Sequence, residues 1–421
     1  MSAHSTSLPS LVIVGNGMVA GRLLDELLER QNRDGAKHYE ITVIGAEPHG
    51  SYNRIMLSSV LAKDTSVKAI VQKDHDWYQS KGIRFISGSP VTAIEREAKW
   101  VETACGQRVS YDELVLATGS RAARIPAENL DLNNIFLFRT IADTEGMMQV
   151  AAGASSAVVV GGGLLGLEAA YGLAKFGIKV TLVHRSGWLL NRQLDKQAGA
   201  MLKTVMQDMG IEFCLGDEIA SFREQNGSVC GARLKSGREL RAELAVVATG
   251  ITPNAELGLE HGLNGQRAID VDDFMQSSAA NISALGECIE HRGATFGLVD
   301  PLWRQAETLA ARLVNRELVP FENQAIATKL KVSGVQVFSA GQVQEQAGQR
   351  AVVIEDKQAR IYRKLIIDQG RIVGVVLFGD VRSGAHYFDL MQAGKNVSAD
   401  LPQLIFGQEF AESPGDKELA A

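Results

Sequence analysis

The chain has 421 residues, a length typical of about two to four domains. Hydrophobic residues make up 45% and charged residues 22%, which is ordinary for a folded protein and excludes a disordered chain. The formal net charge of −6 implies no polyanion-binding surface, so we do not expect nucleic acid as a partner. The sequence predicts neither a disulfide framework nor a metal site, because no CxxC pair or zinc-ligand spacing occurs among Cys105, Cys214, Cys230 and Cys288.

The N-terminus, MSAHSTSLPS, is polar and lacks the basic segment and apolar core of a signal peptide. The one long apolar stretch, residues 157–174, contains three consecutive glycines and Glu168, and its periodicity changes in the middle. A buried strand that leads into a buried helix explains this pattern better than a membrane span does. We therefore expect no membrane association and a cytoplasmic location.

A short apolar strand, a glycine-rich turn and a helical pattern occur twice in the chain. The first copy, LVIVGNGMVAG, begins at Leu11, and the second, AVVVGGGLLGLEAA, begins at Ala157. In both copies a second strand follows the helix, and a strand-rich segment then ends in Ala-Thr-Gly, at 117–119 and 248–250. This repeat predicts two βαβ dinucleotide-binding units, each with a small β insertion.

The turn Gly-x-Gly-x-x-Gly/Ala has a defined physical role in a βαβ unit. Its first glycine makes the tight turn, its second lets a pyrophosphate approach, and its third residue lets helix and strand pack closely. The N–H groups of the helix N-terminus then face the phosphates. The first copy supplies Gly15, Gly17 and Ala20, and the second supplies Gly161, Gly163 and Gly166.

The residue at the end of the second strand contributes to nucleotide selection, because a carboxylate there accepts hydrogen bonds from the adenosine ribose. The first copy has Glu47 at this place, with a surface carboxylate as the alternative interpretation. The second copy has His184-Arg185, where Arg185 either meets the 2′-phosphate of NADPH or lies in solvent. The position leaves NADH and NADPH open. Two sites in one chain predict a tightly held FAD in the first and an exchanging NAD(P)H in the second.

The chain resembles the pyridine nucleotide–disulphide oxidoreductase family over nearly its whole length. It is most similar to the FAD–NAD(P)H reductase module of assimilatory nitrite reductases and to the electron-transfer subunits of nitrate assimilation, with rubredoxin, ferredoxin and oxygenase-coupled reductases as further relatives. The closer match is carried by residues 52–59 (YNRIMLSS), 191–195 (NRQLD), 286–303 (GECIEHRG to PLW) and 329–340 (KLKVSG and VFSA).

This resemblance implies an α/β fold of two Rossmann-like dinucleotide-binding domains in a glutathione-reductase-like arrangement, followed by a C-terminal α+β domain. Strands of the last domain are expected at 330–339, 351–355, 361–367 and 372–378, with a helix at 384–394. The expected domain limits are 1–120 with 245–322 for the FAD-binding domain, 121–244 for the NAD(P)H-binding domain and 323–421 for a C-terminal interface domain.

The resemblance also implies roles for single residues. Gly15, Gly17, Ala20 and Glu47 correspond to the FAD adenosine and pyrophosphate site, with Arg54 near the pyrophosphate. Gly161, Gly163 and Gly166 correspond to the NAD(P)H site. Cofactor binding is further expected at Thr118, Gly119, Gly286 and Glu287. Gly286-Glu287 resembles the second flavin motif, in which the family usually has aspartate where this chain has the longer glutamate.

Two residues are expected to act near the reacting rings. Glu168 corresponds to a glutamate near the nicotinamide and the flavin, and the alternative is a helix carboxylate turned to solvent. Trp303 lies in a helix that passes close to the flavin in the family, where it would shield the ring or lie on the electron route. The alternative for Trp303 is a core tryptophan.

The absence of a cysteine pair near residues 57–59 argues against thiol-based redox chemistry. Disulphide reductases of the family carry a cysteine pair where this chain has Leu57-Ser58-Ser59, and a serine hydroxyl has no disulfide or sulfenate state. Oxygenase-coupled relatives carry a lysine in place of Ser59, so the serine favours the nitrite and nitrate branch. Cys288 has no partner cysteine, and the interpretation favoured for it is a buried small hydrophobic residue.

The predicted function is electron transfer from NADH or NADPH through FAD to a metal centre on a separate polypeptide, such as a nitrate or nitrite reductase catalytic subunit. The four scattered cysteines supply no iron–sulphur site for that centre. A rubredoxin or ferredoxin reductase is the first alternative. A flavoprotein that senses a nucleotide and signals to a partner is an alternative of another class. The sequence leaves a monomer and a homodimer open.

Overall fold

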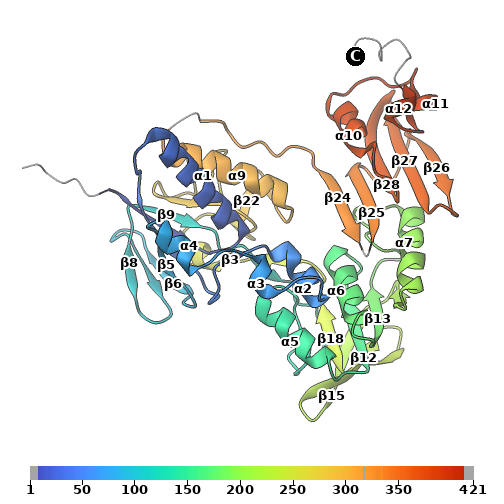
Figure 1. Cartoon of the computed structure of the whole chain (residues 1–421), viewed down its shortest axis with the longest axis horizontal. Helices are drawn as coiled ribbons and strands as arrows, with labels where there is room; N and C mark the ends of the chain where they lie inside the picture. Colours follow the sequence, from blue (N-terminus) through green and yellow to red (C-terminus); the bar gives the residue numbers. More distant parts are fainter. Residues whose placement is uncertain (1–7, 316–317, 333, 412–421) are drawn as a thin grey trace, which may run out of the picture.

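The computed structural model describes residues 8–315, 318–332 and 334–411 (Figure 1). Within these ranges, three five-stranded sheets organise the chain, and smaller two- and three-stranded sheets are formed by the segments that connect their strands. Residues 1–7, which entered the interpretation of the N-terminus, lie outside the described residues, as do residues 412–421 of the expected C-terminal domain.

The first large sheet is entirely parallel, in the order β21-β9-β1-β2-β5. Its strands are β1 (Ser10–Val14), β2 (Glu40–Ile44), β5 (Arg84–Ile86), β9 (Glu113–Leu116) and β21 (Ile282–Ala284). β1 lies at the centre and is almost uniformly apolar, as a strand covered on both faces must be. β21 joins from a distant part of the chain by pairing with β9, so this sheet closes only after the second sheet is complete.

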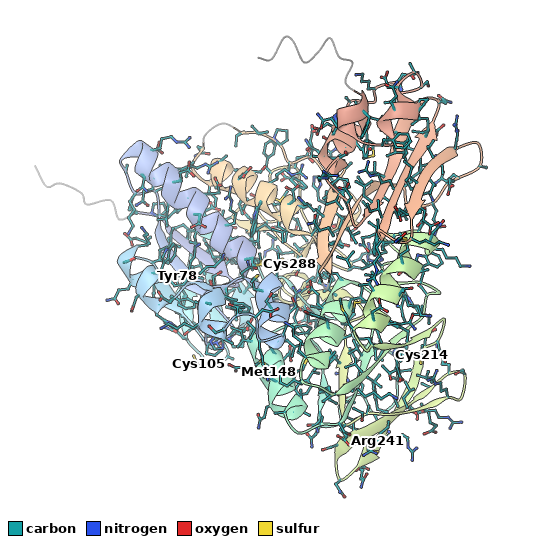
Figure 2. All side chains as sticks on the ribbon, turned by 45° about the vertical axis from the view of Figure 1, so that its right-hand side comes forward. Tyr78, Cys105, Met148, Cys214, Arg241 and Cys288 are labelled. Carbon is teal, nitrogen blue, oxygen red and sulfur yellow. The ribbon has the colours of Figure 1, made fainter. Side chains whose placement is uncertain are left out.

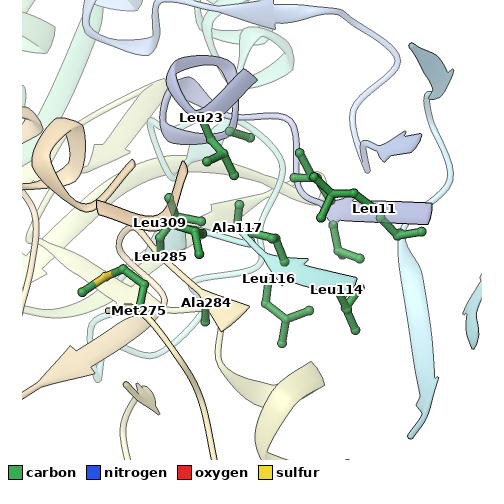
Figure 3. Packing of buried hydrophobic residues seen from close by; sticks show 14 of the residues in the cluster. Leu11, Leu23, Leu114, Leu116, Ala117, Met275, Ala284, Leu285 and Leu309 are labelled. Atoms are coloured by element: carbon green, nitrogen blue, oxygen red, sulfur yellow. The ribbon is translucent and has the colours of Figure 1, made fainter. Parts of the chain in front are cut away.

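Two long helices cover this sheet side by side, α1 (Met18–Asp34) and α9 (Val299–Leu313) (Figure 1). Leu23 of α1 and Leu309 of α9 are fully buried and belong to the same cluster as Leu116 of β9 (Figure 3). The early and late segments of the chain therefore form one hydrophobic core.

The second large sheet repeats this parallel plan, in the order β11-β18-β12-β13-β14. Its strands are β11 (Ile135–Phe136), β12 (Ser156–Val160), β13 (Lys179–His184), β14 (Glu212–Leu215) and β18 (Leu244–Val247). The associated helices are α5 (Ile141–Ala151), α6 (Leu164–Ala174) and α7 (Lys196–Asp208). The prediction of two Rossmann-like units is confirmed. The limits of the domains stay predictions, and the expected limit at residue 245 falls inside β18, which pairs with β12.

Each parallel unit carries a three-stranded antiparallel insertion just before the strand that leads into its Ala-Thr-Gly turn. The first consists of β6 (Val91–Glu95), β7 (Trp100–Thr103) and β8 (Arg108–Ser110), and the second of β15 (Ile219–Gln225), β16 (Ser228–Leu234) and β17 (Glu239–Arg241). After each Ala-Thr-Gly turn comes a short strand, β10 (Ser120–Ala122) or β19 (Ile251–Pro253), and these two pair with each other in antiparallel fashion. The two units are therefore joined by equivalent segments.

The C-terminal sheet is antiparallel, in the order β24-β25-β28-β27-β26. Its strands are β24 (Ala327–Val332), β25 (Val335–Gly341), β26 (Arg350–Asp356), β27 (Ile361–Asp368) and β28 (Arg371–Phe378), and the helix α10 (Gly384–Gln392) follows. The expectation of one strand over 330–339 is wrong. Gly334 has a φ of +88°, so the chain reverses there and forms a hairpin.

Short elements complete the described chain. In the first unit they are β3 (Ser51–Tyr52), the 3₁₀ turn η1 (Arg54–Met56), α2 (Leu57–Leu61), α3 (Val67–Ile70), β4 (Val71–Lys73) and α4 (His75–Ser80). Later ones are α8 (Glu256–Leu259), β20 (Ile269–Asp270), β22 (Ile289–His291), β23 (Ala294–Thr295), α11 (Leu401–Leu404) and α12 (Gln408–Ala411). The four cysteines are all free, and Figure 2 places Cys105, Cys214 and Cys288 on separate parts of the molecule.

A buried polar cluster holds the C-terminal sheet against the N-terminus of α7. One carboxylate oxygen of Asp195 accepts a hydrogen bond from the Ala198 N–H at 3.0 Å and thereby caps the helix. The other accepts from the Tyr362 hydroxyl at 2.6 Å and from Lys364 Nζ at 2.9 Å, both from β27. Lys364 Nζ also donates to Glu345 at 2.9 Å. We refer to Asp195, Tyr362, Lys364 and Glu345 as the Asp195 cluster.

The ammonium group of Lys364 stays charged in this cluster. Burial lowers the pKa of Lys364, but the hydrogen bonds to Asp195 and Glu345 outweigh burial and leave that pKa above its ordinary value. Apolar packing also joins the two parts, because Leu194 and Leu202 belong to the same buried cluster as Phe378 of the C-terminal sheet.

Replacing Lys364 with methionine should destabilise the protein. The Lys364 side chain is only 5% exposed, so its loss leaves the Asp195 carboxylate buried without its cation. Breaking a buried pair in this way costs about 3 kcal/mol. The measurement is the free energy of unfolding from guanidinium denaturation. The matched control is Lys357→Met, whose ion pair with Glu355 is 4.0 Å long and whose side chain is 82% exposed. Equal losses in the two variants would contradict the prediction.

Candidate functional site

A cavity of about 1290 Å³ lies where the carboxyl ends of the two parallel sheets meet. Both glycine-rich turns, both Ala-Thr-Gly turns and the residues after β2 and β13 contribute to its wall. This is the edge at which open α/β sheets bind their ligands. The two repeats therefore present equivalent edges to one shared space.

The first glycine of each turn is required by a close backbone approach. Gly15 has a φ of +109°, and a Cβ there would lie 2.1 Å from the carbonyl oxygen of Ala117. Gly161 has a φ of +122°, and a Cβ there would lie 2.2 Å from the carbonyl oxygen of Ala248. In both units the glycine turn therefore packs directly on the Ala-Thr-Gly turn.

The second and third positions of the turns differ from the first. A Cβ at Gly17 or at Gly163 would meet nothing within 4 Å, so the backbone there faces open space on the cavity wall. A Cβ at Gly166 would lie 1.9 Å from the carbonyl oxygen of Gly161, which explains the small third residue. Ala20 occupies the third place in the first turn and is fully buried. Ala20 and Gly166 thus contribute packing, while Gly17 and Gly163 border the cavity.

Three helices begin at the cavity wall without a polar capping side chain. The N-cap residues of α1, α6 and α9 are Gly17, Gly163 and Leu298, and all three line the cavity. By contrast, the N-terminus of α5 is capped by Thr140 and that of α7 by Asp195. The first N–H groups of a helix have no partner within the helix and attract anionic groups. The cavity is therefore suited to ligands with phosphates.

Glu47 lies in a polar cluster at the first turn. Its carboxylate accepts hydrogen bonds from the Tyr52 hydroxyl at 2.9 Å and from Arg54 at 2.9 Å. Arg54 also donates to the backbone carbonyl of Arg139. Both Glu47 and Arg54 line the cavity, so the structure brings these two predicted residues together.

Glu287 forms a second polar cluster in the same cavity. Its carboxylate accepts hydrogen bonds from Arg139 and from the Ser120 hydroxyl, the latter at 2.7 Å. Arg139 also donates to Ser120 Oγ at 2.9 Å. Neither Arg139 nor Ser120 was predicted from the sequence. Ser120 directly follows the Ala-Thr-Gly turn and could have been noticed, whereas Arg139 lies in no motif.

Thr118, Gly119 and Gly286 have structural partners around this cluster. The Thr118 hydroxyl donates to the carbonyl oxygen of Asn254 at 2.6 Å, and the Asn254 N–H donates to the carbonyl oxygen of Gly119 at 2.9 Å. Gly286 has a φ of +97°, and its N–H donates to Gln305 at 2.8 Å. Thr118 and Gly119 line the cavity, while Gly286 places the neighbouring Glu287 on its wall.

Glu168 and Trp303 both line the cavity. The Glu168 side chain is hydrogen-bonded to Ser58, and burial raises its pKa to about 7, with the Ser58 hydrogen bond acting in the opposite direction. The alternative interpretation, a helix carboxylate turned to solvent, therefore does not describe Glu168. Trp303 is half-buried and packs on the core of the first unit, so it combines a core contact with a place on the cavity wall.

The end of β13 carries His184 and Arg185. His184 Nδ1 accepts a hydrogen bond from the Gly162 N–H at 3.1 Å, and its Nε2 lies 3.2 Å from the side-chain oxygen of Asn191. Arg185 is exposed and lines the cavity. The role of each predicted site residue stays a prediction.

The residues of the cavity fit two dinucleotides. The open backbone at Gly17 and Gly163 leaves space for a pyrophosphate at each turn. Asn16, between the first two glycines of the first turn, lines the cavity, and its side-chain nitrogen is buried with no hydrogen-bond partner among the described residues. Such an unpaired buried donor favours a site completed by an acceptor.

Comparison with known proteins identifies the class. Residues 9–311 match the pyridine nucleotide-disulphide oxidoreductase model, and residues 327–395 match the rubredoxin NAD⁺ reductase C-terminal domain. The chain belongs to the pyridine nucleotide-disulphide oxidoreductase family. The predicted resemblance and fold are confirmed, and so is the expectation of an oxidoreductase that uses FAD and NAD(P)H.

Individual members of the family are similar to this chain over most of its length. The chain is 41% identical over 411 residues to a nitrite reductase [NAD(P)H] of Bacillus subtilis, covering 98% of this chain and 50% of that protein. It is 38% identical to an assimilatory nitrate reductase electron transfer subunit of the same organism, covering 94% and 51%. The chain thus spans about half the length of these relatives. The reductase in a covalent putidaredoxin reductase–putidaredoxin complex has the same fold, with a TM-score of 0.83 at 23% identity and 99% coverage of both chains.

No helix among the described residues is long and apolar enough to cross a membrane. In the same part of the chain, no group of three or more histidine, cysteine, aspartate or glutamate side chains could hold a metal ion.

Substitutions at the two open glycines should separate the two nucleotide sites. Gly17 and Gly163 have φ values of −79° and −82°, which alanine adopts readily, so neither variant should lose its fold. A methyl group in the ligand space costs about 1–3 kcal/mol, so binding should weaken about tenfold or more. Gly17→Ala should weaken FAD binding, measured by flavin fluorescence quenching. Gly163→Ala should weaken NAD(P)H binding to the FAD-saturated protein.

Each variant is the control for the other. FAD-saturated Gly17→Ala should bind NAD(P)H like the wild type, and Gly163→Ala should bind FAD like the wild type. The reverse pattern, or equal effects on both ligands, would contradict the assignment of the turns.

Proposed function

We propose that this chain transfers electrons from NAD(P)H through FAD to a metal centre that lies outside these 421 residues, in the assimilation of nitrate or nitrite in the cytoplasm. The observation that supports this most strongly is the single cavity bordered by both open glycines, because it brings two dinucleotides to one place. The two Bacillus subtilis relatives support the choice of acceptor, which is a catalytic subunit or domain that reduces nitrite or nitrate.

The bound flavin would take a hydride from NAD(P)H and release electrons singly, so the protein has to supply placement and electrostatics. The N-termini of α1 and α6 bind the two pyrophosphates, and the Glu47 and Glu287 clusters bind hydroxyls of the FAD. The Arg139 partner of Glu287 keeps that carboxylate in one orientation. Trp303 excludes water from the side of the cavity that it lines.

Glu168 holds a proton close to neutral pH. Its position on α6, in the helix that begins at the NAD(P)H turn, favours a place near the nicotinamide. Because its pKa is about 7, Glu168 is ionised in about half of the molecules at that pH. An ionised Glu168 stabilises positive charge that develops nearby during hydride loss.

A rubredoxin or ferredoxin reductase is the alternative acceptor assignment. The match of residues 327–395 to the rubredoxin NAD⁺ reductase C-terminal domain favours it specifically. Steady-state turnover with purified rubredoxin or ferredoxin, compared with turnover with a nitrite reductase catalytic fragment, separates the two assignments. A nucleotide-sensing flavoprotein would turn over slowly with every carrier.

Anaerobic titration of the FAD-loaded protein with NADH, and separately with NADPH, tests the redox function. Absorbance is followed at about 450 nm, a band of oxidised flavin. At least one nucleotide should bleach this band rapidly and stoichiometrically. A protein that binds no FAD, or a flavin that neither nucleotide bleaches, would refute the electron-transfer function and favour the sensing alternative.

The rate of flavin reduction should rise as the pH increases through about 7, because Glu168 becomes anionic over this range. The rate is measured by stopped-flow absorbance between pH 5.5 and pH 8.5, about one and a half units on either side of that pKa. Over this range the rate should rise about fivefold, and in Glu168→Gln it should stay nearly constant. Ser58→Ala removes the hydrogen bond that lowers the pKa of Glu168, so its inflection should move to higher pH. An unchanged profile in Glu168→Gln would exclude this role.

A further inference from the structure

We infer that the Asp195 cluster holds the second glycine turn in the conformation that binds NAD(P)H, so that Tyr362 of the C-terminal sheet is a positioning residue for the nucleotide. This inference rests on the proposed function, because it assigns the second turn to NAD(P)H. It goes further in giving the C-terminal sheet a part in nucleotide binding. The contacts that support it lie in residues 188–195, between β13 and α7, which we call the linking segment.

The middle peptide of the second turn is held from both sides. The Gly162 N–H donates to His184 Nδ1 at 3.1 Å, and the Gly162 carbonyl oxygen accepts from the Leu190 N–H at 2.8 Å. His184 Nε2 lies 3.2 Å from the side-chain oxygen of Asn191, so the linking segment holds the histidine as well. Gly163 follows directly and is the N-cap of α6. These bonds therefore fix the direction of the helix N–H groups that would face a pyrophosphate.

Leu190 is the strained point of the linking segment. It has a φ of +50°, a left-handed conformation that is unfavourable for a residue with a side chain. Leu190 is only 1% exposed, and its carbonyl oxygen accepts from the N–H groups of Gln193 and Leu194 at 2.7 and 2.8 Å. Such a conformation persists only where the surrounding structure enforces it. The linking segment therefore depends on a firm attachment at its other end.

The linking segment is packed onto the first turns of α7. The Trp188 indole N–H donates to the carbonyl oxygen of Leu194 at 3.0 Å, which closes the segment into a compact loop. Gly199 lets this loop approach the helix, because a Cβ there would lie 2.7 Å from the Trp188 ring and 2.9 Å from the carbonyl oxygen of Leu189. The loop and the N-terminus of α7 therefore form one packed unit.

The Asp195 cluster attaches this unit to the C-terminal sheet, which lies beside α7 (Figure 1). Asp195 directly follows Leu194, and its carboxylate accepts from the Tyr362 hydroxyl at 2.6 Å and from Lys364 Nζ at 2.9 Å. The cluster lies outside the cavity wall, so Tyr362 acts on a nucleotide only through the linking segment. The residues of that segment that line the cavity are Leu190, Asn191, Arg192 and Gln193.

A weaker attachment lowers the affinity for the nucleotide. Without the Tyr362 hydroxyl, the linking segment leaves its strained conformation in a fraction of the molecules. The measured affinity then falls in proportion to the fraction that keeps the binding conformation. The first glycine turn packs on Ala117 instead, so FAD binding should not depend on this attachment.

Binding of NAD⁺ and of NADP⁺ to the FAD-loaded full chain, measured by calorimetry, tests the inference. Tyr362→Phe keeps the buried ring and removes only the hydroxyl. The Kd of the more tightly bound nucleotide should rise about threefold to tenfold, the usual effect of one hydrogen bond, while the affinity for FAD stays that of the wild type.

The matched control is Asp208→Ala. Asp208 is the last residue of α7 and pairs with Arg360 of the C-terminal part at 2.7 Å, so this variant also removes a contact between α7 and that part of the chain. It leaves the linking segment and the Asp195 cluster intact. Asp208→Ala should therefore bind FAD and both oxidised nucleotides like the wild type.

Stopped-flow reduction of the flavin separates positioning from a general loss of structure. In Tyr362→Phe, the concentration of NADH or NADPH that gives half the maximal rate should rise by the same factor as the Kd. The rate at saturation should stay that of the wild type, because a saturating nucleotide selects the binding conformation. Guanidinium denaturation of both variants verifies that each is folded under the conditions of the assay.

Three outcomes would overturn the inference. They are an unchanged nucleotide Kd in Tyr362→Phe, an equal rise of that Kd in Asp208→Ala, and a lower saturating rate in Tyr362→Phe at an unchanged half-saturating concentration. A wild type that binds NAD⁺ or NADP⁺, but whose flavin is bleached by neither reduced nucleotide, would refute the proposed function and leave this inference standing.

Discussion

The contact between each glycine turn and its Ala-Thr-Gly turn is the constraint on which the rest of the structure depends. Gly15 lies against Ala117, and Gly161 lies against Ala248, each so closely that no side chain fits between them. The chain then continues from each Ala-Thr-Gly turn into β10 or β19, and these two strands pair with each other. The same contact that shapes each nucleotide turn therefore also sets how the two units face one another across the cavity.

The charges inside the cavity are arranged in advance of any ligand. Glu47 and Glu287 are each held by an arginine, and Arg54 links the two clusters through the backbone carbonyl of Arg139. Preorganised dipoles and ion pairs do not need to reorient when a cofactor binds, so they favour one bound geometry. The end of β13 departs from this internal balance, because Arg185 has no ion pair among the described residues.

The sequence was sufficient to predict the features that depend on local patterns. The two βαβ units, their glycine turns and the antiparallel insertions are each encoded within a few tens of residues by apolar periodicity and turn residues. The hairpin at Gly334 was missed, because the apolar residues on either side of it read as one continuous strand. The partners of the site were also missed, since Arg139 and Ser120 reach Glu287 from more than 140 residues away. Such pairs leave no periodic signal and follow only from the packing of the two units.

The Asp195 cluster shows that the repeat seen in the sequence and the unit stabilised in the fold have different limits. As a repeat in the sequence, the second βαβ unit is a self-contained copy of the first. In the folded structure the unit is not self-contained, because Asp195, which caps α7, accepts hydrogen bonds from Tyr362 and Lys364 of the C-terminal sheet. A fragment cut before β24 would leave the Asp195 carboxylate without its Tyr362 hydroxyl and Lys364 ammonium donors. The N-terminus of α7 in the nucleotide-binding unit therefore depends for part of its stability on residues of the third sheet.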